Sequence, residues 1–425
     1  MRILIPATTV LLTVTAMAEQ PEIPDALAQV GRERIVTLLP QLLKEKELDC
    51  WLVFTREGAT DPLLQQLGSD HMVARAALIF GHDPQGNYRR IAIAASYDIT
   101  PLINSALYDT VISYKSEGIK PHLQQTMEEL APGKVAINRS RDVPMADGLT
   151  TGMLGYLEET LPQLKDKFMS AEELIISLFS RKSPEEIAAV RKAAEQTQQI
   201  IREAFSSKVV KPGKTTEQDI AGYLNKRAAQ LNMENTCMSI VAGPMRGHAG
   251  PSDRVIQRGD LLRSDICFSY QGYTSDIQRT AYVLQKGEKR APDFVQKLWN
   301  DAKAANRAAL SVIEPGVPAY RIDAAGREML ISLGHGSFPH GSGHAIGREV
   351  HDLGPLPAPD WPERYGSVSF AKLEAGMTMA IEPALYTNEP RLGGEINVGI
   401  EEDIVVTESG YEVLGELQEE LWLIK

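Results

Sequence analysis

Two aspartates lie at the ends of a short stretch with the pattern of a β-hairpin. In DICFSYQGYTSDIQRT, residues 265–280, Asp265 begins one strand-like run and Asp276 lies in the next, with a Gly-containing turn after Gln271. A turn centred near Gln271 pairs residues whose numbers sum to about 541, which places Asp265 directly opposite Asp276. Like charges that face each other destabilise a strand pair. The pattern therefore requires a compensating positive charge, either a nearby cation such as Arg279 or a pair of divalent metal ions.

A glycine-rich segment further along the chain supplies three histidines. In HGSGHAIGREVHD, His340, His344 and His351 share the segment with Gly341 and Gly343. These glycines indicate a loop, which differs from the helical two-histidine pattern of zinc proteases. Because neutral imidazole is a common ligand of transition metals, the loop offers nitrogen ligands to a metal site.

Two glutamates lie in apolar, strand-like runs near the C-terminus. Glu382 is part of MAIEPALY, and Glu401 is part of VGIEEDIVV. Burying a carboxylate without a partner is unfavourable, although an ordinary salt bridge would explain either glutamate taken alone. With Asp265, Asp276 and one histidine they form an oxygen-rich donor set whose charge offsets two divalent cations. Such a set favours manganese, with zinc, cobalt or iron as alternatives.

The strands that carry these residues belong to a region that begins near residue 183. Ser183, followed by Pro184 and by Glu186, has the pattern of a helix N-cap with a capping box. A helix before Pro212-Gly213 and a helix after it recur around Pro315-Gly316. Each pair then runs into strands, which predicts two pseudo-symmetric halves with a site between them.

The preceding residues, from about 30 to 165, alternate helical and strand-like runs. RERIVTLLPQLLKEKELD is amphipathic at the helical period, whereas CWLVFT, ARAALIF and RIAIAA favour short strands. This alternation predicts a smaller α/β domain, with the domain boundary between about 165 and 182.

The N-terminus has the pattern of an export signal. MRILIPATTVLLTVTAMAEQ contains one Arg, a short apolar run and Ala-Met-Ala before Glu19, which fits a secretory signal peptide, residues 1–18, cleaved after Ala18. The apolar run is too short and too rich in Thr for a convincing membrane span. We therefore expect a secreted or periplasmic protein with no membrane attachment beyond the signal.

Composition limits the classes of partner. The 425 residues carry a formal net charge of −12 and three cysteines, Cys50, Cys237 and Cys267. An acidic chain without a basic cluster argues against nucleic acid and anionic membrane surfaces as partners, and it does not select a substrate. An odd and sparse set of cysteines does not form a disulfide-rich scaffold.

Four stretches, in this order, resemble one enzyme family. GDLLRSDICFSYQGYTSDIQRT, HGSGHAIGREVHD, IEPALY and GIEED are similar to the motifs of the pita-bread metallopeptidases, the family of aminopeptidase P, prolidase, methionine aminopeptidase and creatinase. The resemblance implies an α/β (α+β) fold, with a creatinase-like N-terminal domain at 19–170 and a pita-bread catalytic domain with pseudo-symmetric halves at 171–425. It also implies removal of the N-terminal residue from Xaa-Pro peptides, as an aminopeptidase or a dipeptidase, by a homodimer or larger homo-oligomer.

The resemblance also implies a role for each metal ligand. Asp265 would chelate one of two divalent metal ions, Asp276 and Glu401 would bridge both, and His344 and Glu382 would complete the other. Two such ions lower the pKa of a water molecule and polarise a carbonyl group.

Other side chains would act on the substrate. Glu382 would carry a proton to the departing nitrogen. His248 and His351 would donate hydrogen bonds to the oxyanion of the tetrahedral transition state. His340 and Tyr386 would line the substrate pocket.

Two positions depart from the family pattern. The last glutamate is usually preceded by Arg-Ile, whereas Gly399 and Ile400 precede Glu401 here, which leaves substrate preference open. Cys267 stands where Gly is common, and packing, metal ligation or redox sensitivity would each explain it.

Two other functions therefore remain as alternatives. One is the same fold and metals acting on a small non-peptide C–N substrate. The other is a non-catalytic binding protein on the same scaffold, which a loss of metal ligands would indicate, whereas Asp265, Asp276, His344, Glu382 and Glu401 are all present.

Overall fold

The computed structural model describes residues 12–13, 26–247 and 249–425, with side chains from residue 30 onward. The chain divides into two compact units, residues 1–178 and 179–425. This division falls within helix α6 (Glu172–Ser180), shortly after the expected domain boundary at residue 170. Ala18 and most of the expected export signal lie outside the described residues. Among the described helices, none is long and apolar enough to span a bilayer.

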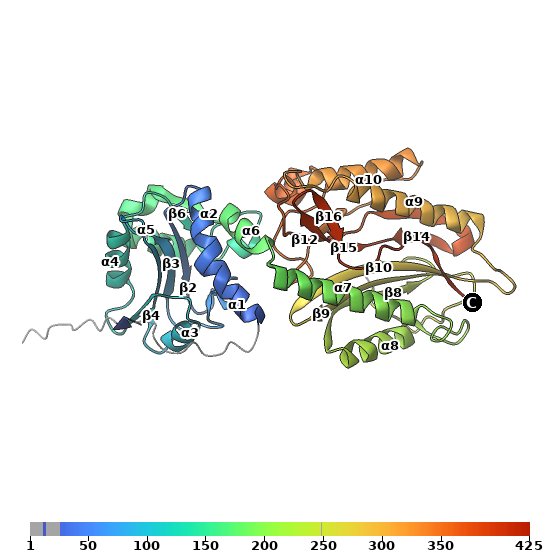
Figure 1. The fold of residues 1–425 in the computed structure, drawn as a ribbon, viewed down its shortest axis with the longest axis horizontal. Helices are drawn as coiled ribbons and strands as arrows, with labels where there is room; N and C mark the ends of the chain where they lie inside the picture. The colour runs from blue at the N-terminus through green and yellow to red at the C-terminus, as the bar shows by residue number, and fades with distance from the viewer. Residues whose placement is uncertain (1–11, 14–25, 248) are drawn as a thin grey trace, which may run out of the picture. The chain divides into compact units, whose positions relative to one another are not determined.

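The first unit is built on a seven-stranded mixed sheet in the order β1-β5-β4-β3-β2-β6-β7. Apolar side chains of α4 and α5, among them Leu123, Met127 and Leu157, pack with those of the central strands to form its core. The expectation of a smaller α/β domain is confirmed (Figure 1). Its strands are β1 (Leu12–Thr13), β2 (Cys50–Thr55), β3 (Ala76–His82), β4 (Tyr88–Ala95), β5 (Thr110–Tyr114), β6 (Val135–Ile137) and β7 (Phe168–Ser170). Its helices before α6 are α1 (Ala26–Glu33), α2 (Leu39–Glu45), α3 (Ile99–Asn104), α4 (Lys120–Leu130) and α5 (Thr151–Thr160).

The second unit repeats one arrangement of elements. In each half, two helices joined through a Pro-Gly step lead into antiparallel strands. Gly213 and Gly316 occupy equivalent steps, with φ of 80° and 87°, a region that only glycine adopts readily. Their N–H groups donate to Ile256 and Leu373, both at 2.8 Å. The predicted pseudo-symmetric halves are therefore confirmed. The helices are α7 (Pro184–Ala204), α8 (Glu217–Gln230), α9 (Asp293–Leu310), α10 (Tyr320–Ser332) and the short α11 (Pro362–Tyr365).

Helix α7 begins as the sequence predicts. The side chain of Ser183 accepts a hydrogen bond from the N–H of Glu186, and Glu186 bonds back to the N–H of Ser183. The helix packs against β9 and β10 with its buried face, which includes Val190, Ala194 and Ile201.

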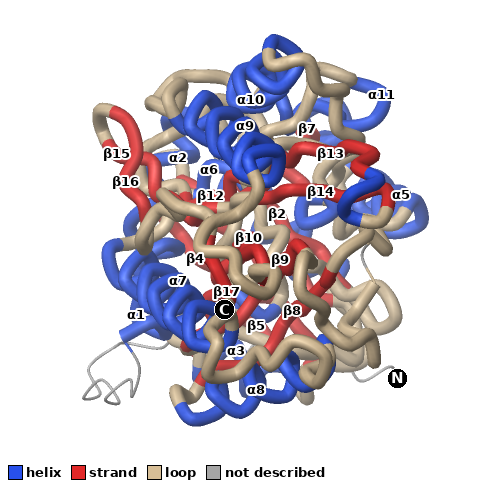
Figure 2. Tube along the Cα trace, turned by 90° about the vertical axis from the view of Figure 1, so that its right-hand side faces the viewer, coloured by secondary structure: helices blue, strands red, loops and turns tan. Residues whose placement is uncertain are grey.

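Three sheets complete the second unit, in the orders β17-β10-β9-β8, β11-β12-β15-β16 and β13-β14. Trp299 of α9 belongs to a buried cluster with Leu385 and Val398 of the β13-β14 ribbon, and Figure 2 shows α9 beside this ribbon and α8 beside β8. The strands are β8 (Met233–Ala242), β9 (Leu261–Tyr270), β10 (Tyr273–Val283), β11 (Gly343–Ala345), β12 (Thr378–Ile381), β13 (Ala384–Glu389), β14 (Gly394–Gly399), β15 (Glu402–Thr407), β16 (Gly410–Val413) and β17 (Trp422–Ile424).

Candidate metal centre

The β9-β10 hairpin brings Asp265 and Asp276 to the same face of the sheet. Gln271 and Gly272 form its two-residue loop, both with positive φ, 51° and 76°, as in a type I′ turn. The register pairs Asp276 with Cys267 and Asp265 with Gln278. The expected direct opposition of the two aspartates is therefore wrong by two residues in the pairing, because the turn is centred between residues 271 and 272. The aspartates are diagonal neighbours, a separation that two side chains still bridge.

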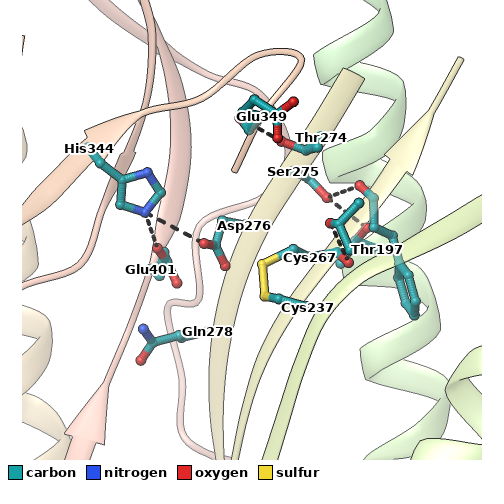
Figure 3. Close-up of a disulfide and its surroundings, with 12 residues drawn as sticks. Thr197, Cys237, Cys267, Thr274, Ser275, Asp276, Gln278, His344, Glu349 and Glu401 are labelled. Atoms are coloured by element: carbon teal, nitrogen blue, oxygen red, sulfur yellow. Dashed lines mark hydrogen bonds and ion pairs between the residues drawn. A yellow bond between two sulfur atoms is a disulfide. The ribbon is translucent and has the colours of Figure 1, made fainter. Parts of the chain in front are cut away.

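His344 reaches this face from β11. Its Nε2 atom lies 3.5 Å from Oδ2 of Asp276, 3.8 Å from Oε1 of Glu401 and 3.9 Å from Oε1 of Glu382. Figure 3 shows the imidazole pointing toward Asp276 and Glu401. A Cβ atom on the neighbouring Gly343 would collide with the carbonyl oxygen of Ala380. Glycine at 343 thus permits the close β11-β12 pairing that positions His344.

Side chains of the helices fix the segments that carry the ligands. Asn306 of α9 is fully buried, and its amide donates to the carbonyls of Ile381 at 2.9 Å and Ile400 at 3.1 Å. These carbonyls immediately precede Glu382 and Glu401, so one amide sets the positions of both glutamates.

The histidine loop is fixed in a similar way by α10. Asp323 and Arg327 form a salt bridge at 2.8 Å. Arg327 donates to the carbonyl of His340 at 2.7 Å, and the carboxylate of Asp323 accepts a hydrogen bond from Ser342 at 2.9 Å. The loop that leads to His344 is therefore anchored at two points.

The carboxylates of this site carry an unfavourable concentration of negative charge. Burial, and then the charge of Asp276, raise the pKa of Asp265 to about 7. Burial raises the pKa of Glu382 to about 8, against the opposing charge of His344. The pKa of Glu401 is raised well above its ordinary value by burial and by the charge of Asp276. These shifts arise because like charges crowd a low-dielectric site.

The same surroundings favour the charged form of His344. Burial lowers the pKa of His344, but the hydrogen bond to Asp276 and the charge of Glu382 outweigh it and raise the pKa to about 9. An imidazole with several carboxylates around it thus carries the positive charge that this site requires.

The donor set fits divalent metal ions. Both carboxylate oxygens of Glu401 and Oδ1 of Asp276 are buried without a hydrogen-bond donor among the described residues. Ligand atoms of Asp276, His344 and Glu401 lie within 4.8 Å of one another. Buried acceptors without donors are rare in folded proteins, and hard cations are the partners that such oxygens bind.

A second layer of side chains supports the ligands. The carboxylate of Asp403 accepts from the backbone N–H of Asp276 at 3.1 Å. Arg279, considered above as a cation for the aspartates, instead pairs with Glu402 at 2.8 Å and donates to the carbonyl of Glu401 at 2.7 Å. The expected pairing of the two aspartates with Arg279 is therefore wrong.

A cavity of about 410 Å³ opens onto the centre. His340 lies on its wall with its Nε2 atom 3.1 Å from the hydroxyl of Tyr386. The His351 ring packs edge-on against His344 at 4.3 Å between ring centroids. His248 lies outside the described residues. The lining residues are Arg263, Asp265, Gln278, His340, Gly341, Gly343, His344, Ala345, His351, Asp352, Gly354, Leu356, Arg364, Tyr365, Glu382, Ala384, Tyr386 and Asn397.

The sequence reasoning missed a disulfide beside the centre. Cys237 of β8 faces Cys267 of β9 in the register and is bonded to it, with 4.7 Å between the Cα atoms. Figure 3 shows the bond next to Asp276, which faces Cys267 from β10. A sulfur in a disulfide is not a thiolate ligand, so in this form Cys267 does not act as a metal ligand. The sequence feature that could have indicated this disulfide is the presence of one cysteine in each of two successive strand-like runs.

Gln278 was also missed. Its amide nitrogen donates to Oε2 of Glu382 at 3.0 Å, and its position directly opposite Asp265 follows only from the true register. It orients a carboxylate of the centre from the neighbouring strand.

The sequence of the second unit is similar to those of known peptidases. Residues 188–408 match the model of metallopeptidase family M24. A Xaa-Pro dipeptidase of Pyrococcus horikoshii is 30% identical over 273 residues, 63% of this chain and 72% of that protein. An uncharacterized peptidase of Staphylococcus aureus strain MW2 is 28% identical over 298 residues, 68% of this chain and 74% of that protein.

Solved structures with low sequence identity share the fold. A dipeptidase, PepE, of Mycobacterium ulcerans superposes with a TM-score of 0.69 at 22% identity, covering 93% of this chain and 98% of that one. An X-Pro aminopeptidase of Thermotoga maritima superposes with a TM-score of 0.63 at 22% identity, covering 91% and 98%. The pita-bread fold is thus confirmed. With the match to the family model and the convergent acidic centre, these findings establish that the chain is a metallopeptidase and belongs to family M24.

Proposed function

We propose that this metallopeptidase removes the N-terminal residue from peptides with proline in second position. The observation that carries the proposal is the buried acidic centre, in which the two carboxylate oxygens of Glu401 have no hydrogen-bond donor in the described part of the chain and lie beside His344 and Asp276. The Xaa-Pro activity named for the Pyrococcus horikoshii relative supports the substrate class.

Two divalent metal ions, manganese first among the candidates, would be held by Asp265, Asp276, His344, Glu382 and Glu401. When bound, they would activate a water molecule and polarise the scissile carbonyl. The oxygen-rich donor set supports this choice of metal, since carboxylates suit manganese well.

The chain's own groups would divide the remaining work. Gln278 orients the carboxylate of Glu382 through a hydrogen bond to one of its oxygens, and this carboxylate would exchange a proton with the departing nitrogen. His351 lies at the cavity beside His344, where an imidazole N–H would stabilise a developing oxyanion. His340 and Tyr386, linked at 3.1 Å, would form a wall against the proline ring.

Hydrolysis of Xaa-Pro peptides tests the proposal. Residues 19–425 would be treated with a chelator, reloaded with manganese and assayed for release of alanine from Ala-Pro and Ala-Pro-Ala, beside Asp276→Asn. Metal-dependent release that the variant loses supports the proposal. Tight metal binding without release from either peptide would instead favour the second candidate, a hydrolase of small non-peptide C–N substrates.

That second candidate rests on one structural observation. Gly399 stands where the family's motif usually carries Arg, and the Gln278 amide occupies the space beside it, so no cationic side chain extends from this position. The small size of the cavity, about 410 Å³, suits either a short peptide or a small amide.

The protein is proposed to act outside the cytoplasm after cleavage of the signal at Ala18. Disulfides persist mainly in oxidising compartments, and the Cys237–Cys267 bond supports this proposal.

A further inference from the structure

Arg263 is a buried cation without a salt bridge among the described residues. Its side chain projects from β9, the residue is only 9% exposed, and its Nε atom is buried without an acceptor among the described residues. Its charge acts on the nearby carboxylates of Asp265 and Glu382 and lowers the pKa of each, but neither carboxylate forms a salt bridge with it. Because an unpaired buried charge is strongly unfavourable, this position calls for an anionic partner from outside the chain.

The guanidinium faces the catalytic cavity. Arg263 lines this cavity together with Asp265, Glu382 and Asn397. Since Arg263 and Asp265 are two residues apart on one strand, they share a face with Cα atoms about 7 Å apart. Once metal ions occupy the centre, the carboxylates are committed to them, and the charge of Arg263 remains uncompensated.

The neighbouring strands leave room for this side chain. A Cβ atom on Gly399 would overlap Oε1 of Gln278 and would lie 4.0 Å from Cδ of Arg263. Gln278 and Arg263 therefore fill the space that a side chain at 399 would enter. The cation absent from position 399 has a counterpart on the adjacent strand.

We propose that Arg263 binds the α-carboxylate of the residue that follows the scissile bond, so that free dipeptides are the preferred substrates. This inference rests on the proposed function. In a dipeptide the carboxylate lies within one residue, about 3.8 Å between Cα atoms, of the scissile carbonyl, so a cation on the same cavity wall as the ligand Asp265 is in the region where this carboxylate would lie. A guanidinium also suits a carboxylate because its N–H groups form a planar fork. In a tripeptide an amide takes that place, and the cation stays unpaired.

Arg364 provides a matched control, because it is the other arginine on the cavity wall. It is exposed, and its guanidinium lies 5.0 Å from the ring centre of Tyr365 and 5.9 Å from that of Trp361. An exposed, stacked cation is hydrated and has no comparable need for a substrate anion.

The test compares Ala-Pro with its C-terminal amide, Ala-Pro-NH2, on the manganese-loaded enzyme. The wild type is expected to favour Ala-Pro by about 10-fold or more in kcat/KM. Arg263→Gln should raise KM for Ala-Pro by about 10- to 100-fold, the range for a charged hydrogen bond, with little change in kcat. The variant should cleave the amide as the wild type does. Arg263→Lys should retain part of the preference, and Arg364→Gln should retain all of it.

Equal cleavage of dipeptide and amide by the wild type would overturn the inference. So would an Arg263→Gln enzyme that loses both activities equally, since that pattern indicates a role in positioning the metal ligands. Circular dichroism confirms that each variant is folded, and metal analysis confirms that it is loaded. If Arg263→Gln does not fold, the preference for Ala-Pro over Ala-Pro-NH2 is compared between the wild type and Arg263→Lys.

A calorimetric experiment separates this inference from the proposed function. Should the wild type cleave no Xaa-Pro substrate, the proposed function fails, and binding of L-proline and L-prolinamide still tests the carboxylate site. L-proline is expected to bind the wild type more tightly than L-prolinamide does, and Arg263→Gln should abolish the difference. No difference in the wild type would overturn the inference.

Discussion

At the scale of single residues, Glu401 and its neighbours explain why this centre requires metal ions. Both of its carboxylate oxygens are buried, and no residue that the structure describes donates a hydrogen bond to them. Its pKa, like those of Asp265 and Glu382, is raised chiefly by burial. The residue types and order predicted that these side chains share one site, because each acid lies in or beside an apolar strand. Gln278 and Arg263 were not predicted, because a polar residue in a strand has many ordinary explanations until the register is known.

Replacing Asp276 tests its assignment as a ligand. Asp276→Asn should lower metal content and reduce Xaa-Pro hydrolysis by about 100-fold or more, since several kcal/mol of transition-state stabilisation depends on the metals. Asp293→Asn, at an aspartate whose side chain is 85% exposed, is the matched control. The test measures the metal content of each variant by mass spectrometry and its initial rate of hydrolysis. An active Asp276→Asn enzyme with full metal content would contradict the assignment.

The raised pKa values predict how the metal-free protein responds to pH. In the folded protein the pKa of Asp265 is raised from 3.8 to about 7, and the pKa of Glu382 is raised from 4.5 to about 8. The folded state therefore binds more protons than the unfolded state between about pH 4 and 8, and its stability falls as pH rises through this range. The pKa of His344, which is raised from 6.5 to about 9, also makes the stability fall as pH rises.

Thermal unfolding of chelator-treated protein should thus show a lower Tm at pH 8 than at pH 5. Manganese should raise Tm more at pH 8, because the ions and protons compete for the same oxygens. An Asp265→Asn/Glu382→Gln variant should have a flatter pH dependence. A Tm that rises with pH in the metal-free protein would refute this electrostatic account.

At the scale of elements, the β9-β10 hairpin could be predicted from the sequence, but the register of its strands could not. Both strands and the turn were predicted, but the register was not, because moving the centre of the turn by a single residue shifts every cross-strand pair by two residues. That shift decides that Gln278 faces Asp265 and that Cys267 faces Asp276. The Cys237–Cys267 disulfide could not be predicted for a similar reason, since it depends on the register of β8 against β9.

Gly399 and Gln278 should be energetically coupled. Gln278→Ala should reduce kcat by about 10-fold or more, the range for a residue that orients a metal ligand. Gly399→Ala should have a similar effect, because its Cβ atom would displace the Gln278 amide. The double variant should then be little worse than either single variant. Fully additive losses in kcat would show that the two residues act independently.

The disulfide should contribute to stability. Its partners are separated by 30 residues, and closing such a loop corresponds to about 3 to 4 kcal/mol in the free energy of unfolding. Urea unfolding of a Cys237→Ala/Cys267→Ala variant should show this loss. Thiol titration of the denatured protein should find one free thiol, Cys50, and three after reduction. Three thiols before reduction would contradict the assignment.

At the scale of the whole molecule, the class of each unit followed from periodicity, because helix and strand runs alternate in the first unit and recur in the second. The Pro-Gly steps at Gly213 and Gly316 indicated the repeat. What the sequence did not show is the cooperation of distant segments, such as Asn306 bonding beside Glu382 and Glu401, because these contacts join elements far apart in the chain.

Export and assembly can be tested on the intact protein. Expressed from its full coding sequence in a bacterium with a periplasm, the mature protein should begin at Glu19 by N-terminal sequencing. Light scattering during size exclusion should give at least twice the mass of one mature chain, as the resemblance to pita-bread enzymes implies. An uncleaved N-terminus would refute the proposed export, and a monomer would refute the proposed assembly.

The central claim is that five side chains hold two metal ions that hydrolyse an Xaa-Pro bond. The most direct test titrates manganese into chelator-treated protein and follows, in the same samples, metal bound by calorimetry and alanine released from Ala-Pro. The account predicts two bound equivalents per chain and a rate that reaches its maximum when both are bound. Binding of two equivalents without release of alanine, or release that does not depend on metal, would contradict it.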